Sequence, residues 1–348
     1  MAKKIGTIKK IKVRGFKSIM DEQEIELRPL TLLAGANSSG KSSIMQPILL
    51  LKQTIEAQSD PGALLLDGPN VRYTKAEQLL SQVPRQESAA QFSIGIHLQS
   101  SSFIDLVFGR KKGVGFDLSE MKYSDGNKVI KIVPGMSNDD IFTVIPEQLK
   151  DVFEVFASKN YRWTVYRDRC FFAFDLYIPE TRQRLGAVFP GIAGFGASFN
   201  AEFISHLKSI IHLPGLRGNP SRTYLKNAAG PDFPGTFENY VASTLSDWQQ
   251  KKDSRLSEVG GALEEMGLTW KVRAEPVDDT QVELKVGRLP HSRRSRAHDL
   301  VSIADVGIGV SQVLPVVVAL IVAKSGQIVY LEQPEIHLHP HAQRKLAH

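Results

Sequence analysis

Eight consecutive residues, Gly35 to Ser42, match the phosphate-binding pattern GxxxxGK[ST] without substitution. The two glycines let the backbone wrap tightly enough for successive N–H groups to point at phosphate oxygens. Lys41 would reach the β- and γ-phosphates, and the Ser42 hydroxyl would bind Mg²⁺. The pattern therefore predicts that ATP and Mg²⁺ bind to the loop residues Gly35, Asn37, Ser38, Gly40, Lys41, Ser42 and Ser43.

A second candidate group follows the hydrophobic run Gln327 to Leu331. An acidic residue at the end of such a strand holds Mg²⁺ in phosphate-loop ATPases, and its neighbour orients the attacking water. Glu332 stands at the magnesium position and Gln333 at the neighbour's position. An amide can orient water but cannot act as a base near neutral pH, so we expect slow hydrolysis unless another group, such as Glu335, is the base. The predicted catalytic residues are Lys41, Glu332 and Gln333, and the predicted metal ligands are Ser42 and Glu332.

The elements around the loop suit this interpretation. Leu30 to Ala34 is a short apolar run that predicts a buried strand, and Ser42 to Gln58 has the apolar spacing of a helix. Strand, glycine loop and helix form the context that the pattern requires. Pro47 lies inside the predicted helix, where we expect a kink or a loosened turn.

Two further patterns give weaker evidence for a binding site. Asp305 to Gln312 carries two glycines before an apolar helix, an arrangement that can expose N–H groups to an anion but is usually only structural. His337, His339 and His341 alternate, and His-x-His could ligate a metal. No Cys or carboxylate stands at ligand spacing beside them, so we favour a packing role.

Composition narrows the class of protein. The 348 residues are 42% hydrophobic and 23% charged, with one cysteine, Cys170, and no hydrophobic signal region after Met1. These features predict a cytoplasmic protein without disulfides. The longest apolar run, Val313 to Ala323, is too short to span a membrane. A net charge of +6 permits acidic partners, although the basic cluster Arg288 to His298 fits a solvated loop better than a phosphate-contacting patch.

The remaining patterns predict an α/β fold. Lys4 to Ile19 alternates apolar and basic residues, as in a half-buried strand, and Glu24 to Leu27 predicts another strand. Residues 90–133 contain four short alternating runs separated by turn residues, which predict an antiparallel meander, and Asp140 to Ser158 predicts a helix. We expect four parts: an N-terminal head part (1–60), an antiparallel β subdomain (61–135), a mixed α/β insertion (136–285) and a C-terminal head part (286–348).

Three stretches, in this order, resemble ABC-type ATPase heads related to the SMC and RecF proteins, and more closely bacterial AAA-ATPase-like proteins of the overcoming-lysogenization-defect type. They are Ile11 to Ile19, Ala36 to Ser43, and Leu331 to Pro340 with its EQPE and HLHP sequences. The resemblance implies a phosphate-loop NTPase of ABC-head type with an antiparallel β subdomain and a helical insertion. It places Arg14 and Lys17 near the nucleotide. Gly307 to Leu314 resembles a diverged signature motif, in which Gly309 and Ser311 would contact the nucleotide of a second protomer, but Ile308 replaces the usual Ser.

The same resemblance implies a mechanism and partners. Two heads would sandwich two ATP molecules as a homodimer or higher oligomer, and an associated nuclease or toxin effector would act with them in antiphage defence, as with the ATPase of the Septu system. Two alternatives stay open. One is a nucleotide-locked scaffold that hardly hydrolyses ATP, favoured by Gln333. The other is a DNA-binding repair ATPase of RecF type, favoured by the basic N-terminal strand and by the cluster Arg288 to His298.

Overall fold

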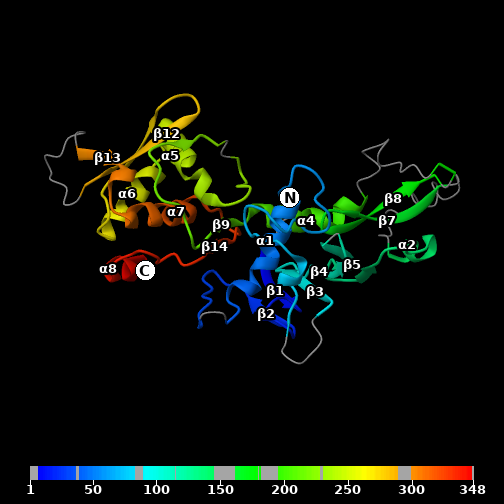
Figure 1. The fold of residues 1–348 in the computed structure, drawn as a ribbon. Coiled ribbons are helices and arrows are strands. Elements are labelled where there is room, and N and C mark those ends of the chain that lie inside the picture. The colour runs from blue at the N-terminus through cyan, green and yellow to red at the C-terminus, as the bar shows by residue number, and fades with distance from the viewer. Residues whose placement is uncertain are drawn as a thin grey trace. The chain divides into compact units, whose positions relative to one another are not determined.

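The protein is described by a computed structural model that covers residues 7–36, 39–82, 89–113, 115–144, 161–178, 180–181, 195–227, 230–288 and 299–346. It divides into two compact units, Met1–Lys208 and Ser209–His348, called here the N-terminal and C-terminal units. Figure 1 labels helices and strands of both units. The finer division into four parts stays a prediction.

A six-stranded antiparallel sheet dominates the N-terminal unit (Figure 1, blue to teal). The strand order β2-β1-β3-β4-β5-β6 confirms the predicted meander and adds the two N-terminal strands to it. Asp125 closes one hairpin by accepting the Asn127 N–H at 2.9 Å, and Gly126 supplies the positive φ of that turn. The strands are β1 (Ile8–Arg14), β2 (Gln23–Glu26), β3 (Gln91–Leu98), β4 (Phe103–Lys111), β5 (Gly115–Ser124) and β6 (Val129–Ile132).

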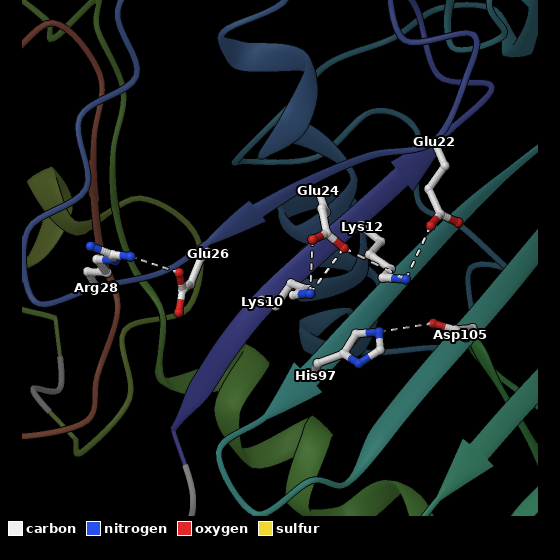
Figure 2. Close-up of polar contacts among 8 residues, drawn as sticks. All are labelled: Lys10, Lys12, Glu22, Glu24, Glu26, Arg28, His97 and Asp105. Carbon is white, nitrogen blue, oxygen red and sulfur yellow. Dashed lines mark hydrogen bonds and ion pairs between the residues drawn. The ribbon is translucent and has the colours of Figure 1, made fainter.

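The alternating pattern of β1 separates its two faces as predicted. Ile11 and Val13 are buried, and Lys10 and Lys12 lie on the more exposed face. Figure 2 shows that these lysines lie opposite glutamates of β2 and the turn before it. Lys10 Nζ lies 2.9 Å from a Glu24 oxygen, and Lys12 Nζ lies 3.2 Å from a Glu22 oxygen. The cationic face of β1 is therefore balanced by neighbouring acids.

The other elements of the N-terminal unit lie between β2 and β3 in the chain or follow β6. A 3₁₀ turn (Ser42–Ile44) leads into α1 (Gln46–Glu56), and the hairpin β7–β8 is rich in buried aromatic residues. Beyond residue 144, the predicted helix Asp140 to Ser158 lies outside the described residues, as does the cluster Arg288 to His298 beyond its first residue. The bounds are η2 (Ala76–Gln78), α2 (Asn138–Val144), β7 (Arg162–Asp168), β8 (Phe171–Tyr177) and α4 (Phe195–Ser209).

The C-terminal unit is built around a two-stranded parallel pair and the apolar helix α7. β9 (Ile211–Leu213) pairs in parallel with β14 (Val329–Leu331), although more than a hundred residues separate them. α7 (Ile308–Val322) buries most of its length against α5 and α6, as its continuous apolar sequence predicts. The other elements are β10 (Tyr224–Leu225), η4 (Phe237–Tyr240), α5 (Val241–Lys251), α6 (Arg255–Glu265), β11 (Val272–Pro276), β12 (Gln281–Gly287), β13 (Leu300–Ser302), η6 (Ile303–Asp305) and α8 (Pro340–Leu346).

The predicted strand at Leu30 to Ala34 is wrong for this structure. The segment is irregular, and Leu30 and Leu32 are 74% and 80% exposed. A strand needs a neighbour for its backbone hydrogen bonds, and no described strand pairs with this segment. An apolar run alone cannot supply that neighbour, so the pattern predicted a strand that does not form here.

The helix after the phosphate loop also differs from the prediction. The α-helix begins at Gln46 rather than Ser42, so Pro47 lies in the first turn and not in the interior. The N–H groups of a first turn have no partner within the helix, and proline therefore costs nothing there. Pro47 therefore interrupts no hydrogen bond inside α1, and the predicted cause of a kink does not apply.

Candidate functional site

The phosphate loop joins the irregular segment 30–34 to the 3₁₀ turn at Ser42. Its glycines have positive φ angles, +155° at Gly35 and +92° at Gly40. A Cβ atom at Gly40 would lie 2.5 Å from Ser18 Oγ, so a larger residue would displace the Ser18 side chain. The backbone conformation favours glycine at position 40, whereas the exposed Ser18 side chain could turn away from a Cβ atom.

Lys41 folds back over its own loop. Its ammonium group donates to the Gly35 carbonyl oxygen at 2.8 Å and to the Ala36 carbonyl oxygen at 2.7 Å. Ser42 is exposed and Ser43 is buried, whereas Asn37 and Ser38 lie outside the described residues. Lys41 therefore contacts the backbone of the phosphate loop, and its role in phosphate binding stays a prediction.

The turn after β1 lies beside this loop. Lys17 Nζ donates to the Gln46 side chain at 2.8 Å and lies 4.6 Å from the centre of the Tyr73 ring. Burial lowers the pKa of Lys17. The neighbouring Ser18 hydroxyl lies 3.5 Å from that of Ser43. Lys17 therefore contacts the start of the phosphate-loop helix, while Arg14 is exposed at the end of β1.

Ser18 has a part in this arrangement that the sequence analysis missed. It approaches both Gly40 and Ser43 from a turn more than twenty residues away. No sequence pattern distinguishes a serine in this position from any other turn residue. Only the folded chain shows that it contacts the loop.

Three consecutive polar residues of α1 are buried behind the loop. Lys52 forms an ion pair with Glu56 and donates to the Lys208 carbonyl oxygen at 3.1 Å. Gln53 donates to the carbonyl oxygens of Leu65 and Val71 and accepts N–H bonds from residues 70 and 71. Thr54 Oγ1 accepts the Leu65 N–H at 2.9 Å. These side chains tie the phosphate-loop helix to the segments that follow it.

The acidic strand end is assembled on the parallel pair β9–β14. The Glu332 N–H continues the pairing by donating to the Leu213 carbonyl oxygen at 3.0 Å. The Glu332 carboxylate accepts the Gly215 N–H at 3.4 Å and lies 3.7 Å from His212 Nε2. Burial acts to raise the pKa of Glu332, but His212 and the Gly215 N–H outweigh it and hold that pKa below its usual value. Glu332 is therefore a carboxylate at neutral pH, which is the form that binds a cation.

Gln333 follows in a left-handed conformation, with φ at +43°. Arg217, which is buried, donates through its guanidinium to the Gln333 carbonyl oxygen at 3.1 Å and to the Glu332 carbonyl oxygen at 3.4 Å. Burial lowers the pKa of Arg217, against the opposing charges of Glu238 and Glu335. The turn after β14 is thus fixed by an arginine from the loop after β9, a residue that the sequence analysis did not select.

The signature-like stretch forms the first turns of α7. Ser311 Oγ donates to the Ile308 carbonyl oxygen at 2.8 Å. A Cβ atom at Gly309 would lie 3.7 Å from the His337 carbonyl oxygen, so this turn lies close to the chain that follows Gln333. Gln312 is buried and donates to the Gly218 carbonyl oxygen at 3.3 Å. The C-terminal unit brings together the signature-like stretch and the acidic strand end.

The histidines after β14 form no metal site among the described residues, where no group of three or more His, Cys, Asp or Glu side chains is arranged to hold a metal ion. His339 Nδ1 accepts the His341 N–H at 3.3 Å, a local contact. All three histidines are exposed, so the packing role that we favoured for them is not supported.

The residues present fit ATP and Mg²⁺. Gly35 and Gly40 have the backbone freedom to wrap a phosphate, and Lys41 supplies the cation. Ser42 in the N-terminal unit offers a hydroxyl and Glu332 in the C-terminal unit offers a carboxylate, and each is by type a hard oxygen ligand of the kind that Mg²⁺ prefers. The individual roles of these residues stay predictions.

Comparison with known proteins gives the family. No curated protein matches the chain. Among the described residues, no helix is long and apolar enough to cross a membrane. One family model matches residues 30–348, which include the phosphate loop, the signature-like stretch and the acidic strand end. The chain therefore belongs to the AAA_21 family, described as "AAA domain, putative AbiEii toxin, Type IV TA system", and is a nucleotide-binding ATPase of the AAA/ABC type.

Proposed function

We propose that this chain is an ATP-binding, slowly hydrolysing head of ABC type that dimerises around nucleotide and controls an associated effector in bacterial antiphage defence. The observation that carries the proposal is the complete phosphate loop, with Lys41 held over its backbone, in a chain of the AAA_21 family. The family description includes a toxin of a toxin–antitoxin system, which supports a partner or activity that harms the cell. The resemblance to the Septu ATPase belongs to this proposal.

In this proposal each residue has a defined task. Lys41 and the loop N–H groups bind the phosphates, and Ser42 and Glu332 hold Mg²⁺, which when bound neutralises charge on the phosphate oxygens. Gln333 orients the attacking water without accepting its proton. Gly309 and Ser311 bind the nucleotide of the second protomer.

Gln333 also supports a second candidate, a nucleotide-locked scaffold that restrains its partner and hardly turns over ATP. The amide lies where a base is commoner, and hydrolysis without that base should be slow. The DNA-repair alternative receives less support, because Lys10 and Lys12 of the basic strand are paired with glutamates.

The test is the rate of ATP turnover by the native chain and by a Gln333→Glu variant, with the oligomer mass recorded with and without ATP and Mg²⁺. We expect slow native turnover, a larger assembly with ATP, and at least about tenfold faster turnover in the variant, because a carboxylate supplies the base. Lys41→Ala should remove nucleotide binding and is the control for a contaminating ATPase. No ATP binding by the native chain would overturn the proposal. Assembly with ATP but no turnover would favour the scaffold.

A further inference from the structure

The loop after β9, residues 214–222, contacts two predicted functional segments of the C-terminal unit. On one side Arg217 donates to the main chain at Glu332 and Gln333. On the other side Gln312, in the second turn of α7, donates to the Gly218 carbonyl oxygen at 3.3 Å and to that of Arg217 at 3.5 Å. One short loop therefore lies between the signature-like helix and the turn that carries Gln333.

The chemistry of Arg217 is unusual for a buried arginine. The side chain is only 8% exposed, yet the described hydrogen bonds of its guanidinium go to three main-chain carbonyl oxygens, those of Pro214, Glu332 and Gln333. Its Nε–H has no hydrogen-bond partner among the described residues. A desolvated charge of this kind is costly, and three carbonyl contacts made at once fix the positions of two chain segments relative to each other.

The hydrogen bond from Arg217 to the Gln333 carbonyl oxygen supports an uncommon backbone conformation at Gln333. A non-glycine residue with φ at +43° is in a region that L-residues seldom adopt, and the surrounding structure must hold it there. The carbonyl oxygen that Arg217 contacts belongs to this residue, and it also accepts the Ile336 N–H at 3.2 Å. Arg217 therefore stabilises the conformation that sets where the Gln333 side chain points.

Gly215 of the same loop lies close to the side chain of Gln333. A Cβ atom at Gly215 would lie 2.9 Å from the Gln333 side-chain oxygen, closer than a side chain permits. Gly215 has no positive φ, so its backbone does not itself require glycine. Its lack of a side chain leaves room for the Gln333 amide.

We propose that Arg217 and Gly215 are positioning residues for Gln333, and that Gln312 links that position to the first turns of α7. This inference rests on the proposed function, because it assigns the placement of the water-orienting amide in ATP hydrolysis. Through these contacts, the loop of residues 214–222 makes the rate of ATP hydrolysis sensitive to the position of the signature-like stretch. None of these three residues contacts the nucleotide in this proposal.

The test is a double-mutant cycle on ATP turnover in the full chain. Arg217→Met, Arg217→Lys and Gly215→Ala are each made with Gln333 present and with Gln333→Ala. We expect Arg217→Met and Gly215→Ala to lower kcat about tenfold with Gln333 present, Arg217→Lys to lower it less, and ATP affinity to change by less than about twofold. In the Gln333→Ala background the same changes should alter kcat by less than about twofold, because the group that they position is gone.

The matched control is Arg222→Ala in the same loop, since Arg222 makes an exposed bidentate pair with Asp305 and no described contact with Gln333. It should leave kcat unchanged. Equal losses in both backgrounds, or a loss of ATP affinity equal to the loss of kcat, would overturn the positioning role. Absence of turnover in the native chain would instead count against the proposed function.

If the native chain does not turn over ATP, hydrogen exchange tests the role of Arg217 independently of turnover. Hydrogen exchange of the Ile336 and Leu338 amides, which bond to the carbonyl oxygens of Gln333 and Glu335, should be faster in Arg217→Lys than in the native chain and unchanged in Arg222→Ala. Unchanged exchange in Arg217→Lys would show that Arg217 does not hold this turn.

Discussion

The phosphate loop and the acidic strand end are built in different ways. Lys41 bonds to carbonyl oxygens five and six residues away, so the loop lysine is held by local contacts. Glu332 bonds to the chain at Gly215, 117 residues away, and Arg217 reaches Gln333 over 116 residues. The loop is a local motif on a helix, whereas the acidic strand end exists only when distant segments meet.

The supporting residues differ as well. Behind the phosphate loop, α1 buries the consecutive polar side chains Lys52, Gln53 and Thr54. In the C-terminal unit Arg217 and Gln312 are also buried, but in α5 the ion pair Lys251–Asp247 and the amide of Gln249 are more exposed. Because a buried polar group costs more when its partner is lost, we expect substitutions behind the loop to have the larger effects. The following predictions test that difference.

The largest effect is expected for Lys52→Met. This change removes the Lys52 cation from its buried ion pair with Glu56 and should lower the free energy of unfolding by about 3–5 kcal/mol, measured by urea denaturation. The matched control is Lys251→Met in α5, where Lys251 forms an exposed pair with Asp247 four residues away, and its cost should be below about 0.5 kcal/mol. Similar costs at both positions would show that burial does not distinguish the two pairs.

The second largest loss of stability is expected for Gln53→Ala. It removes four described hydrogen bonds to the main chain of residues 65–71, at a cost of about 2–4 kcal/mol. Hydrogen exchange should rise in that segment. Gln249→Ala in the C-terminal unit removes two bonds to Ala274 from a partly exposed side chain and should cost about half as much. A larger loss at Gln249 would reverse the comparison.

Gly40→Ala should weaken ATP binding about 10- to 100-fold, because backbone strain at φ +92° costs about 1–3 kcal/mol in the binding conformation. A fluorescent ATP analogue measures this directly. Gly261→Ala in α6 is the control, since a Cβ atom there meets nothing within 4 Å and alanine favours helix by about 0.5–1 kcal/mol. Unchanged ATP affinity in Gly40→Ala would remove the conformational argument for the loop glycine.

The smallest effect concerns the pH dependence of stability through Asp60, just after α1. Hydrogen bonds from Arg167 hold the pKa of Asp60 below its usual value. A depressed carboxyl pKa contributes stability above the unfolded value, near 3.9, and that contribution disappears as the pH falls through the folded value. Asp60→Asn should therefore cost at most about 1 kcal/mol at pH 7 and less at pH 3, measured by thermal unfolding. In an Arg167→Gln background the difference between the two pH values should shrink, and a cost that grows on acidification would contradict the prediction.

Much of the local structure was predictable from sequence. Alternation identified β1 and the strands of the meander because one face of each strand is buried. A continuous apolar run, rather than alternation, predicted the buried helix α7. The strand predicted at residues 30–34 was wrong because pairing depends on a neighbour that a pattern cannot specify. The start of α1 was misplaced because proline favours the first turn.

The sequence by itself determined the phosphate loop, its two glycines, Lys41, and the family to which the chain belongs, because short-range backbone geometry and residue type define such a motif. It also located Glu332 and Gln333 at a strand end. Only the tertiary structure decided that Ser18 lies against Gly40, that His212 lies beside Glu332, and that Arg217 fixes the backbone of Gln333. These contacts join residues that are far apart in the chain. Patterns in a single sequence cannot predict them, because such patterns extend over only a few turns of helix or a few residues of strand.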